Sequence, residues 1–218
     1  MQTQRVWDLP TRVFHGALAL LIALQYATGE FGLLGMRWHF RFGYATLALI
    51  GFRVLWGFFG SQTSRFRDFV RGPRTVLRYL RAQMSTNPQR SIGHNPLGGW
   101  SVLALLTSVA VQAVSGLFAS DGIDTDGPFA AHVSDSTVKL MTRVHHWNEN
   151  LLLILIGLHI VAVLLYLLIE HDNLIAPMIT GVKRVMPTRE LRFANIWLAI
   201  ALFVLCAALV ATLVGLAV

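Results

Sequence analysis

Charged residues are scarce in this chain. Only 13% of its 218 residues are Asp, Glu, Lys or Arg, and 55% are apolar, whereas a soluble domain carries about 25% charged residues. The shortage of charge excludes an ordinary water-soluble globule. The excess of apolar residues excludes an intrinsically disordered chain.

Cysteine is almost absent as well. The one cysteine, Cys206, cannot form an internal disulfide, and the sequence lacks the C-x-x-C-H motif that attaches haem covalently. The first twelve residues, MQTQRVWDLPTR, are polar, so we expect no secretory signal peptide.

Acidic residues are outnumbered, 11 against 18 basic ones, which gives a formal charge of +7. A basic protein can bind nucleic acid. Here the basic residues lie between long apolar runs, so the charge indicates membrane topology and we expect no nucleic-acid partner.

Long runs of apolar residues are abundant in the chain. Crossing a bilayer takes roughly 20 apolar residues, and a chain surrounded by lipid must be helical to satisfy its backbone. The sequence therefore predicts an all-α integral membrane helix bundle. Five spans are expected, at about 13–34, 40–59, 97–118, 147–169 and 193–218.

The loops alternate in charge, and basic loops stay in the cytoplasm. The amino terminus and the two basic loops are therefore expected in the cytoplasm, and the acidic loop and the carboxyl terminus on the opposite side. The basic residues are Arg65, Arg67, Arg71, Arg74, Arg78, Arg81 and Arg90 in segment 60–96 and Lys183, Arg184, Arg189 and Arg192 in segment 171–192; the acidic ones are Asp121, Asp124, Asp126 and Asp135 in segment 119–142.

The long basic loop is compatible with two structures. One is a short helix over about 66–81 that rests apolar residues on lipid headgroups while its arginines reach phosphates. The other is a solvated loop that only enforces topology. We find no internal repeat in the sequence.

Histidines in the spans are the informative residues, because ionisable groups inside a membrane are costly. His145 and His159 are fourteen residues apart. At about 100° per residue they share one helix face, roughly 21 Å apart along the axis. His146 projects from a different face.

Depth then pairs the histidines across the bundle. His39 and His145 lie near the outer side, and His15 and His159 lie deeper, toward the cytoplasm. Two facing pairs can each hold one iron porphyrin by its axial positions. The alternatives are packed, purely structural histidines, or a di-iron or zinc site, which would want carboxylates beside the histidines.

The chain resembles a known family over roughly 5–184. It is similar to the di-haem b-type cytochrome subunits of nickel–iron hydrogenases and to the wider prokaryotic cytochrome b-561 family. The matching motifs are WDLPTRVFH (7–15), RWHFRFGY (37–44), FRVLWGFFGS (52–61), GHNPLGGW (93–100), SGLF (115–118), HHWNENLLLILIGLH (145–159) and NLIAPMITGVK (173–183).

The resemblance implies a di-haem four-helix domain over 1–192 and an additional transmembrane helix over 193–218. It implies two haem b groups, one bound by His39 with His145 and the other by His15 with His159. It also implies electron transfer between the quinone pool and a partner redox protein, in a bacterial inner membrane.

Other residues are candidates for supporting these cofactors, although each also has a plain structural explanation. Arginines can pair with haem propionates or reach to headgroups, and glycines allow close approach of a porphyrin or of another helix. Residues before the third span can cap that helix or contact a quinone. The candidates are Arg12, Arg53, Arg37 and Arg143; Gly43, Gly29 and Gly116; and His94 and Asn95.

Three uses compete for such an electron carrier. We favour reduction or oxidation of a periplasmic c-type cytochrome, because an acidic outer loop suits a small basic partner. The others are the membrane anchor of a nickel–iron hydrogenase and a superoxide:quinone oxidoreductase. A non-redox scaffold or transporter is the alternative from another class, and a homodimer stays open.

Overall fold

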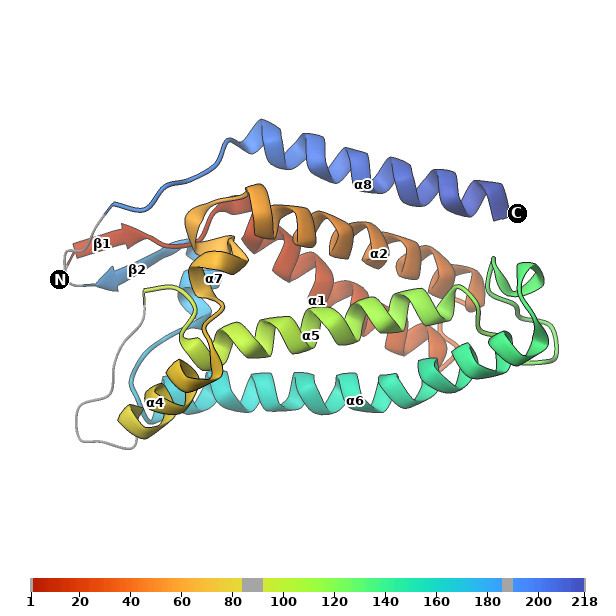
Figure 1. Ribbon diagram of the computed structural model, residues 1–218, viewed down its shortest axis with the longest axis horizontal. Helices are drawn as coiled ribbons and strands as arrows, with labels where there is room; N and C mark the ends of the chain where they lie inside the picture. The colour runs from red at the N-terminus through yellow and green to blue at the C-terminus, as the bar shows by residue number, and fades with distance from the viewer. Residues whose placement is uncertain (1, 84–91, 186–189, 218) are drawn as a thin grey trace.

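The computed structural model describes residues 2–83, 92–185 and 190–217. Long helices dominate it (Figure 1), as the all-α prediction expected. Arg90 and Arg189, two of the predicted topology residues, lie outside the described residues. The elements are β1 (Gln2–Arg5), α1 (Leu9–Gly29), α2 (Met36–Phe59), η1 (Gln62–Ser64), α3 (Phe66–Phe69), α4 (Pro73–Gln83), α5 (Pro96–Gly116), η2 (Ala130–His132), α6 (Asp135–Leu168), α7 (Ile175–Thr180), β2 (Val182–Val185) and α8 (Ile196–Ala217).

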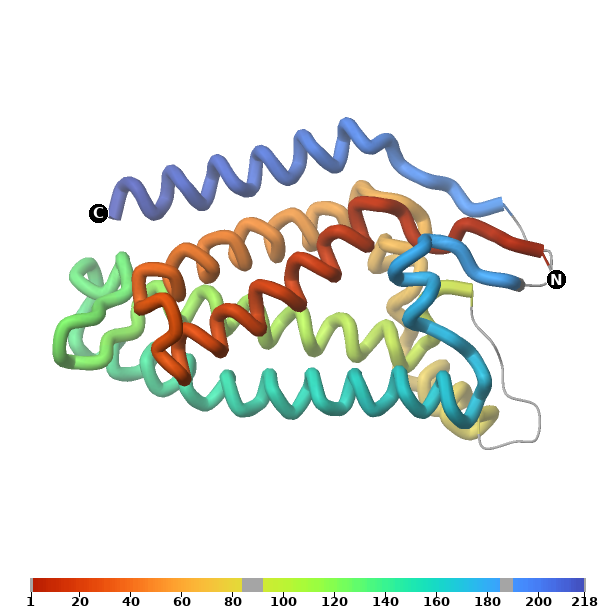
Figure 2. Tube along the Cα trace, turned by 180° about the vertical axis from the view of Figure 1, so that it is seen from behind, coloured from red at the N-terminus to blue at the C-terminus, as the bar shows by residue number. Residues whose placement is uncertain are grey.

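Two helical hairpins, α1–α2 and α5–α6, form a four-helix bundle. The helices of each hairpin contact one another, and α2 also contacts α5. Helix α8 packs on the outside of the bundle against α2 (Figures 1 and 2). Strands β1 and β2 pair antiparallel, with Gln2 opposite Val185, and bring the amino-terminal segment beside the segment after α7.

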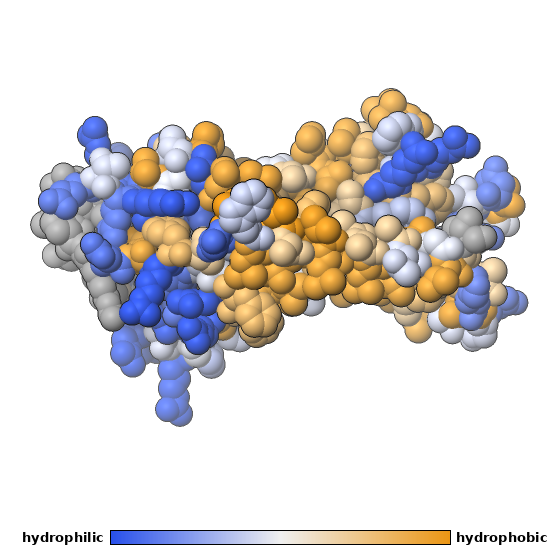
Figure 3. All heavy atoms as spheres, turned by 90° about the horizontal axis from the view of Figure 1, so that it is seen from above, coloured by the Kyte–Doolittle hydropathy of each residue, from blue (hydrophilic) through white to orange (hydrophobic). Residues whose placement is uncertain are grey.

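Four described helices are long and apolar enough to cross a membrane: α2, α5, α6 and α8. Helix α1, the first predicted span, is not among them. Its polar residues Arg12, His15 and Gln25 lower its hydropathy, yet it packs along α2 inside the bundle. Figure 3 shows the apolar surface as a central band with hydrophilic residues gathered at both ends.

The helix ends differ from the predicted spans for local reasons. Helix α1 begins at Leu9 rather than near residue 13, because the Asp8 carboxylate accepts the Thr11 N–H at 2.8 Å and caps the helix. It ends at Gly29, and Gly32 and Gly35 then adopt positive φ angles in the turn to α2. The apolar residues that follow Gly29 belong to this turn and not to the span.

Helix α6 is longer than its predicted span of 147–169. It begins at Asp135, capped by Ser134, and its 34 residues measure about 51 Å, more than the hydrocarbon thickness of about 30 Å. Its first turns therefore project beyond the apolar layer. His145, expected just before the span, lies well inside the helix.

Over residues 66–81 the basic loop forms parts of two α-helices, α3 and α4, and not the single helix predicted there. The chain breaks between α3 and α4 because Pro73 disfavours a helical residue before it and itself begins α4. Tyr79 of α4 is buried, and its hydroxyl lies 2.8 Å from that of Tyr166 on α6. Burial and this hydrogen bond raise the pKa of Tyr79. Leu77 and Leu80 remain exposed, on a helix that also carries Arg74, Arg78 and Arg81.

We predict that Tyr79→Phe loosens α4 without unfolding the bundle. Losing one partly buried hydrogen bond costs about 0.5–1.5 kcal/mol. Tryptic cleavage at Arg78 and Arg81 in detergent-solubilised protein is expected to accelerate several-fold. Tyr26→Phe, which removes a hydroxyl outside this contact, serves as the control. Equal cleavage rates for Tyr79→Phe and the native protein would contradict the proposed docking contact.

Candidate functional site

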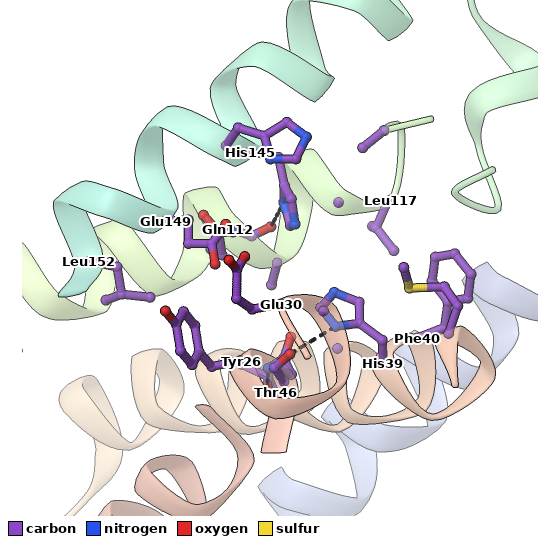
Figure 4. Close-up of a pocket in the computed structure, with 18 of the residues that line it drawn as sticks. Tyr26, Glu30, His39, Phe40, Thr46, Gln112, Leu117, His145, Glu149 and Leu152 are labelled. Atoms are coloured by element: carbon purple, nitrogen blue, oxygen red, sulfur yellow. Dashed lines mark hydrogen bonds between the residues drawn. The ribbon is translucent and has the colours of Figure 1, made fainter. Parts of the chain in front are cut away.

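Two histidines face each other at the end of the bundle that carries the acidic loop. His39 of α2 and His145 of α6 have ring centroids 6.4 Å apart and ring planes 78° apart. Both rings line a cavity between α1, α2, α5 and α6 (Figure 4). We call these two residues the outer pair.

The ring of His39 is held by the end of α1. Its Nδ1 lies 3.1 Å from the carbonyl oxygen of Gln25 and 3.1 Å from the hydroxyl of Thr28. Because a carbonyl only accepts, the Nδ1 carries the hydrogen and donates it. The Nε2 of His39 is therefore left as an electron-pair donor.

The ring of His145 is held in the same way by the end of α5. Its Nδ1 lies 3.0 Å from the carbonyl oxygen of Gln112 and 3.2 Å from the hydroxyl of Ser115. A histidine that binds a metal commonly donates its other N–H to a carbonyl, which orients the ring and makes the ligand more basic. Both histidines of the outer pair have this arrangement.

A glycine lies against each ring of the outer pair. A Cβ added to Gly29 would lie 3.1 Å from Cε1 of His39, and one added to Gly116 would lie 2.8 Å from Cε1 of His145. The two supports thus share the sequence Gln-x-x-(Thr/Ser)-Gly, at 25–29 and 112–116. Each motif forms the end of a 21-residue helix. Both helices have proline in the first turn and a side-chain cap at the start, which is Asp8 for α1 and Asn95 for α5.

This correspondence corrects the expectation that the chain has no internal repeat. The motif QYATG at 25–29 and the motif QAVSG at 112–116 were visible in the sequence. The two motifs share only three positions. Their correspondence becomes recognisable only in the structure, where each motif forms hydrogen bonds with one histidine ring. Gln25, Thr28, Gln112 and Ser115 are the site residues that sequence reasoning did not identify.

Side-chain amides tie the same two supports to the histidine helices. Gln25 donates to the hydroxyl of Thr46 on α2 at 2.8 Å. Gln112 accepts at 2.7 Å from Asn148 on α6, which also binds Ser108. Each histidine is therefore fixed relative to its neighbouring helix by both backbone and side-chain contacts.

A second pair lies deeper in the bundle. His15 of α1 and His159 of α6 have ring centroids 6.4 Å apart and ring planes 53° apart. Among the described residues, neither ring takes part in a hydrogen bond like those of the outer pair. We call these two residues the inner pair.

The spacing of both pairs fits two imidazoles bound on opposite sides of one metal. With metal–nitrogen bonds of about 2.0–2.1 Å and a ring nitrogen about 1.1 Å from its centroid, the centroids would lie about 6.3 Å apart. The described residues contain no group of three or more His, Cys, Asp or Glu side chains suited to a metal ion. Each pair thus brings together two imidazoles and no third group of this kind among the described residues.

The predicted arginines have different surroundings. Arg53 is only 2% exposed, and its Nη1 is buried without a hydrogen-bond partner. Its guanidinium lies over the ring of Phe66, 5.2 Å from the centroid. Arg12 instead donates to the carbonyls of Met178 and Ile179, so it anchors α7.

The remaining candidates line the outer cavity, lie exposed on the surface or cap a helix. Gly43 and Gly116 line the outer cavity, whereas Arg37 and Arg143 are exposed. Asn95 caps α5, with its side-chain oxygen accepting the Gly98 N–H at 2.6 Å. Its amide also donates to the Tyr166 hydroxyl at 2.8 Å. Of the two roles expected for Asn95, the structure shows the capping one.

His94, the other quinone candidate, does not cap the helix. Its ring lies between those of Trp7, at 4.7 Å, and Phe69, at 4.5 Å. Its Nδ1 is buried without a hydrogen-bond partner.

Comparison with known proteins identifies the family. A family model described as prokaryotic cytochrome b561 matches residues 6–181, a range that ends before α8. Searches of curated proteins and of solved structures gave no significant match. The match covers most of the chain and includes both histidine pairs, so this membrane protein belongs to the prokaryotic cytochrome b561 family, whose members are electron-transfer cytochromes that bind b-type haem.

Proposed function

We propose that the chain is a di-haem cytochrome that carries electrons across the membrane between the quinone pool and a redox partner at the outer face. The observation that carries this proposal is that the outer pair and the inner pair each consist of two facing imidazoles with centroids 6.4 Å apart. Fourteen residues of α6 separate the two couples, which is roughly 21 Å along the helix axis.

In this proposal His39 and His145 bind one haem b, and His15 and His159 bind the other. Bound in this way, haem supplies an iron that takes up and releases single electrons. The protein holds the imidazoles in one tautomer, sets their orientation through Gln25 and Gln112, and excludes water with the surrounding apolar side chains. The glycines at 29 and 116 leave room for the rings.

The orientation and the partners that we propose are based on the charges at the two ends of the molecule. The basic end, with α4 and Arg65–Arg71, is placed in the cytoplasm of a bacterium, and the acidic loop in the periplasm. Asp121 folds that loop: its carboxylate accepts the N–H groups of Ile123, Asp124 and Thr125, which lowers the pKa of Asp121 to about 2.

The other three aspartates of this loop, Asp124, Asp126 and Asp135, are exposed. They offer a negative surface to a small basic protein such as a c-type cytochrome. The acidic surface is the specific reason to prefer this partner over the hydrogenase and superoxide alternatives.

Paired histidine variants test the proposal. Replacing both members of one pair, as in His39→Ala with His145→Ala, is expected to leave one haem per chain by pyridine haemochrome assay. Replacing one member of each pair, as in His39→Ala with His159→Ala, is expected to leave none. The control His146→Ala, beside a ligand but on another face, retains two. Loss of haem in the control, or equal loss in both double variants, would contradict the pairing.

A second prediction concerns the glycine behind His145. In Gly116→Ala the new Cβ would lie 2.8 Å from the imidazole and push the ring from its position. We expect haem retention at the outer pair to weaken by about tenfold or more, the scale on which ligand-orienting contacts act. Transfer of haem to apomyoglobin measures this. Gly157→Ala on α6, where a Cβ meets nothing within 4 Å, is the control, and similar transfer rates in both variants would refute the role of Gly116.

A further inference from the structure

Helix α8 does not fill the space beside the bundle completely. An apolar groove of about 600 Å³ lies between α1, α2 and α8, a volume within the range of about 300–1,000 Å³ that is typical of ligand sites. Among the described residues that line it, Tyr44 alone has a polar side chain. Alanines on all three helices keep the groove open: Ala17, Ala45, Ala48, Ala207 and Ala211.

The groove extends from the middle of α8 toward the end of the molecule that carries the acidic loop. At mid-helix a Cβ added to Gly51 of α2 would lie 3.3 Å from Sγ of Cys206 on α8. Tyr44 lies seven residues before Gly51, which is roughly 10.5 Å nearer the start of α2. Helix α2 begins, and α8 ends, at the acidic-loop end of the molecule (Figure 1), so the groove lies on that side of the apolar layer.

Two exposed arginines, Arg37 and Arg41, lie on α2 between the groove and that end of the molecule. Each is within roughly 20° of the groove residue Ala48 around the helix axis, and they lie roughly 16.5 and 10.5 Å from it along the axis. Neither arginine takes part in an ion pair among the described residues. The guanidinium of Arg41 lies over the ring of Trp38, 4.9 Å from the centroid, and tryptophan is enriched where a protein crosses the membrane surface.

The position of these arginines runs against the usual distribution of charge. Basic residues favour the cytoplasmic side of a membrane, yet in the orientation proposed above Arg37 and Arg41 lie on the periplasmic side. Helix α2 also begins there, behind Gly35 and without a side-chain cap, and the start of a helix favours an anion. Arginine binds phosphate through paired hydrogen bonds. A ligand with an anionic phosphate and an apolar chain would therefore match both the arginines and the groove.

We propose that the groove binds one anionic phospholipid, with its phosphate at Arg37 and Arg41 and an acyl chain between α2 and α8. The lipid holds α8, which lies outside the range that matches the family, against the cytochrome core. Tyr44 lines both this groove and the outer cavity. The acyl chain therefore also covers the outer cavity on the side that faces the bilayer.

Native mass spectrometry of the full chain in mild detergent tests the site. The protein is titrated with dioleoylphosphatidylglycerol, which is anionic, or with dioleoylphosphatidylcholine, which is zwitterionic, and the bound lipids are counted. We expect one phosphatidylglycerol to stay bound under conditions that release phosphatidylcholine. Arg37→Gln with Arg41→Gln is expected to weaken this binding by about tenfold or more, because each arginine near the membrane surface adds to the attraction for an anionic lipid.

A second double variant, Ala45→Leu with Ala211→Leu, fills the groove from both sides and is expected to remove the tightly bound lipid while the arginines stay in place. Two controls match the variants. Lys139→Gln with Arg143→Gln removes two exposed charges from α6 at the same end of the molecule. Ala208→Leu adds the same side chain at an exposed position of α8 that does not line the groove. Both controls are expected to retain the lipid.

Equal retention of the two lipids by the native chain, a measurement that needs no variant, would refute the proposal. Unchanged retention of phosphatidylglycerol in the arginine double variant would refute it as well. If added ubiquinone displaces the phosphatidylglycerol, and filling the groove releases the ubiquinone, the groove binds an isoprenoid chain and the proposal is overturned. None of these outcomes depends on haem content, so the di-haem proposal is tested separately.

Discussion

The fold depends on holding imidazole rings between helices that lie in lipid. A ring with an unpartnered N–H in an apolar layer is costly, and a freely rotating ring would be a poor metal ligand. Backbone carbonyls near the ends of α1 and α5 meet both needs for the outer pair, since each accepts a hydrogen bond from an Nδ1 and so fixes the ring and leaves the lone pair on Nε2. Each support comes from the helix that precedes the histidine helix in the chain, so each helical hairpin carries one histidine of the outer pair together with its support.

The outer and inner pairs are equal in spacing but not in support. Both have centroids 6.4 Å apart, yet the carbonyl and hydroxyl partners found at the outer pair have no counterpart at the inner pair among the described residues. The basicity of a ligand and the hydrogen bonds made to that ligand are established means of tuning a metal's potential. The chain therefore has the physical means to give its two proposed haems different potentials, with histidine as the only ligand type.

Much of this arrangement was predictable from the sequence. Helical periodicity put His145 and His159 on one face, loop charge set their depths, and the structure places His39 opposite His145 and His15 opposite His159. Hydropathy could not predict the start of α6, since its first turns project beyond the apolar layer, nor the start of α1, which depends on the Asp8 cap. The contacts of Arg12 with α7 depend on tertiary packing, which no local pattern encodes.

The haem content of the unmodified protein is the measurement on which this account stands. Pyridine haemochrome analysis of the intact chain, purified in mild detergent and normalised to polypeptide by amino-acid analysis, should give two b-type haems per chain. A preparation that retains its helical circular dichroism and contains no haem would contradict the role assigned to both histidine pairs.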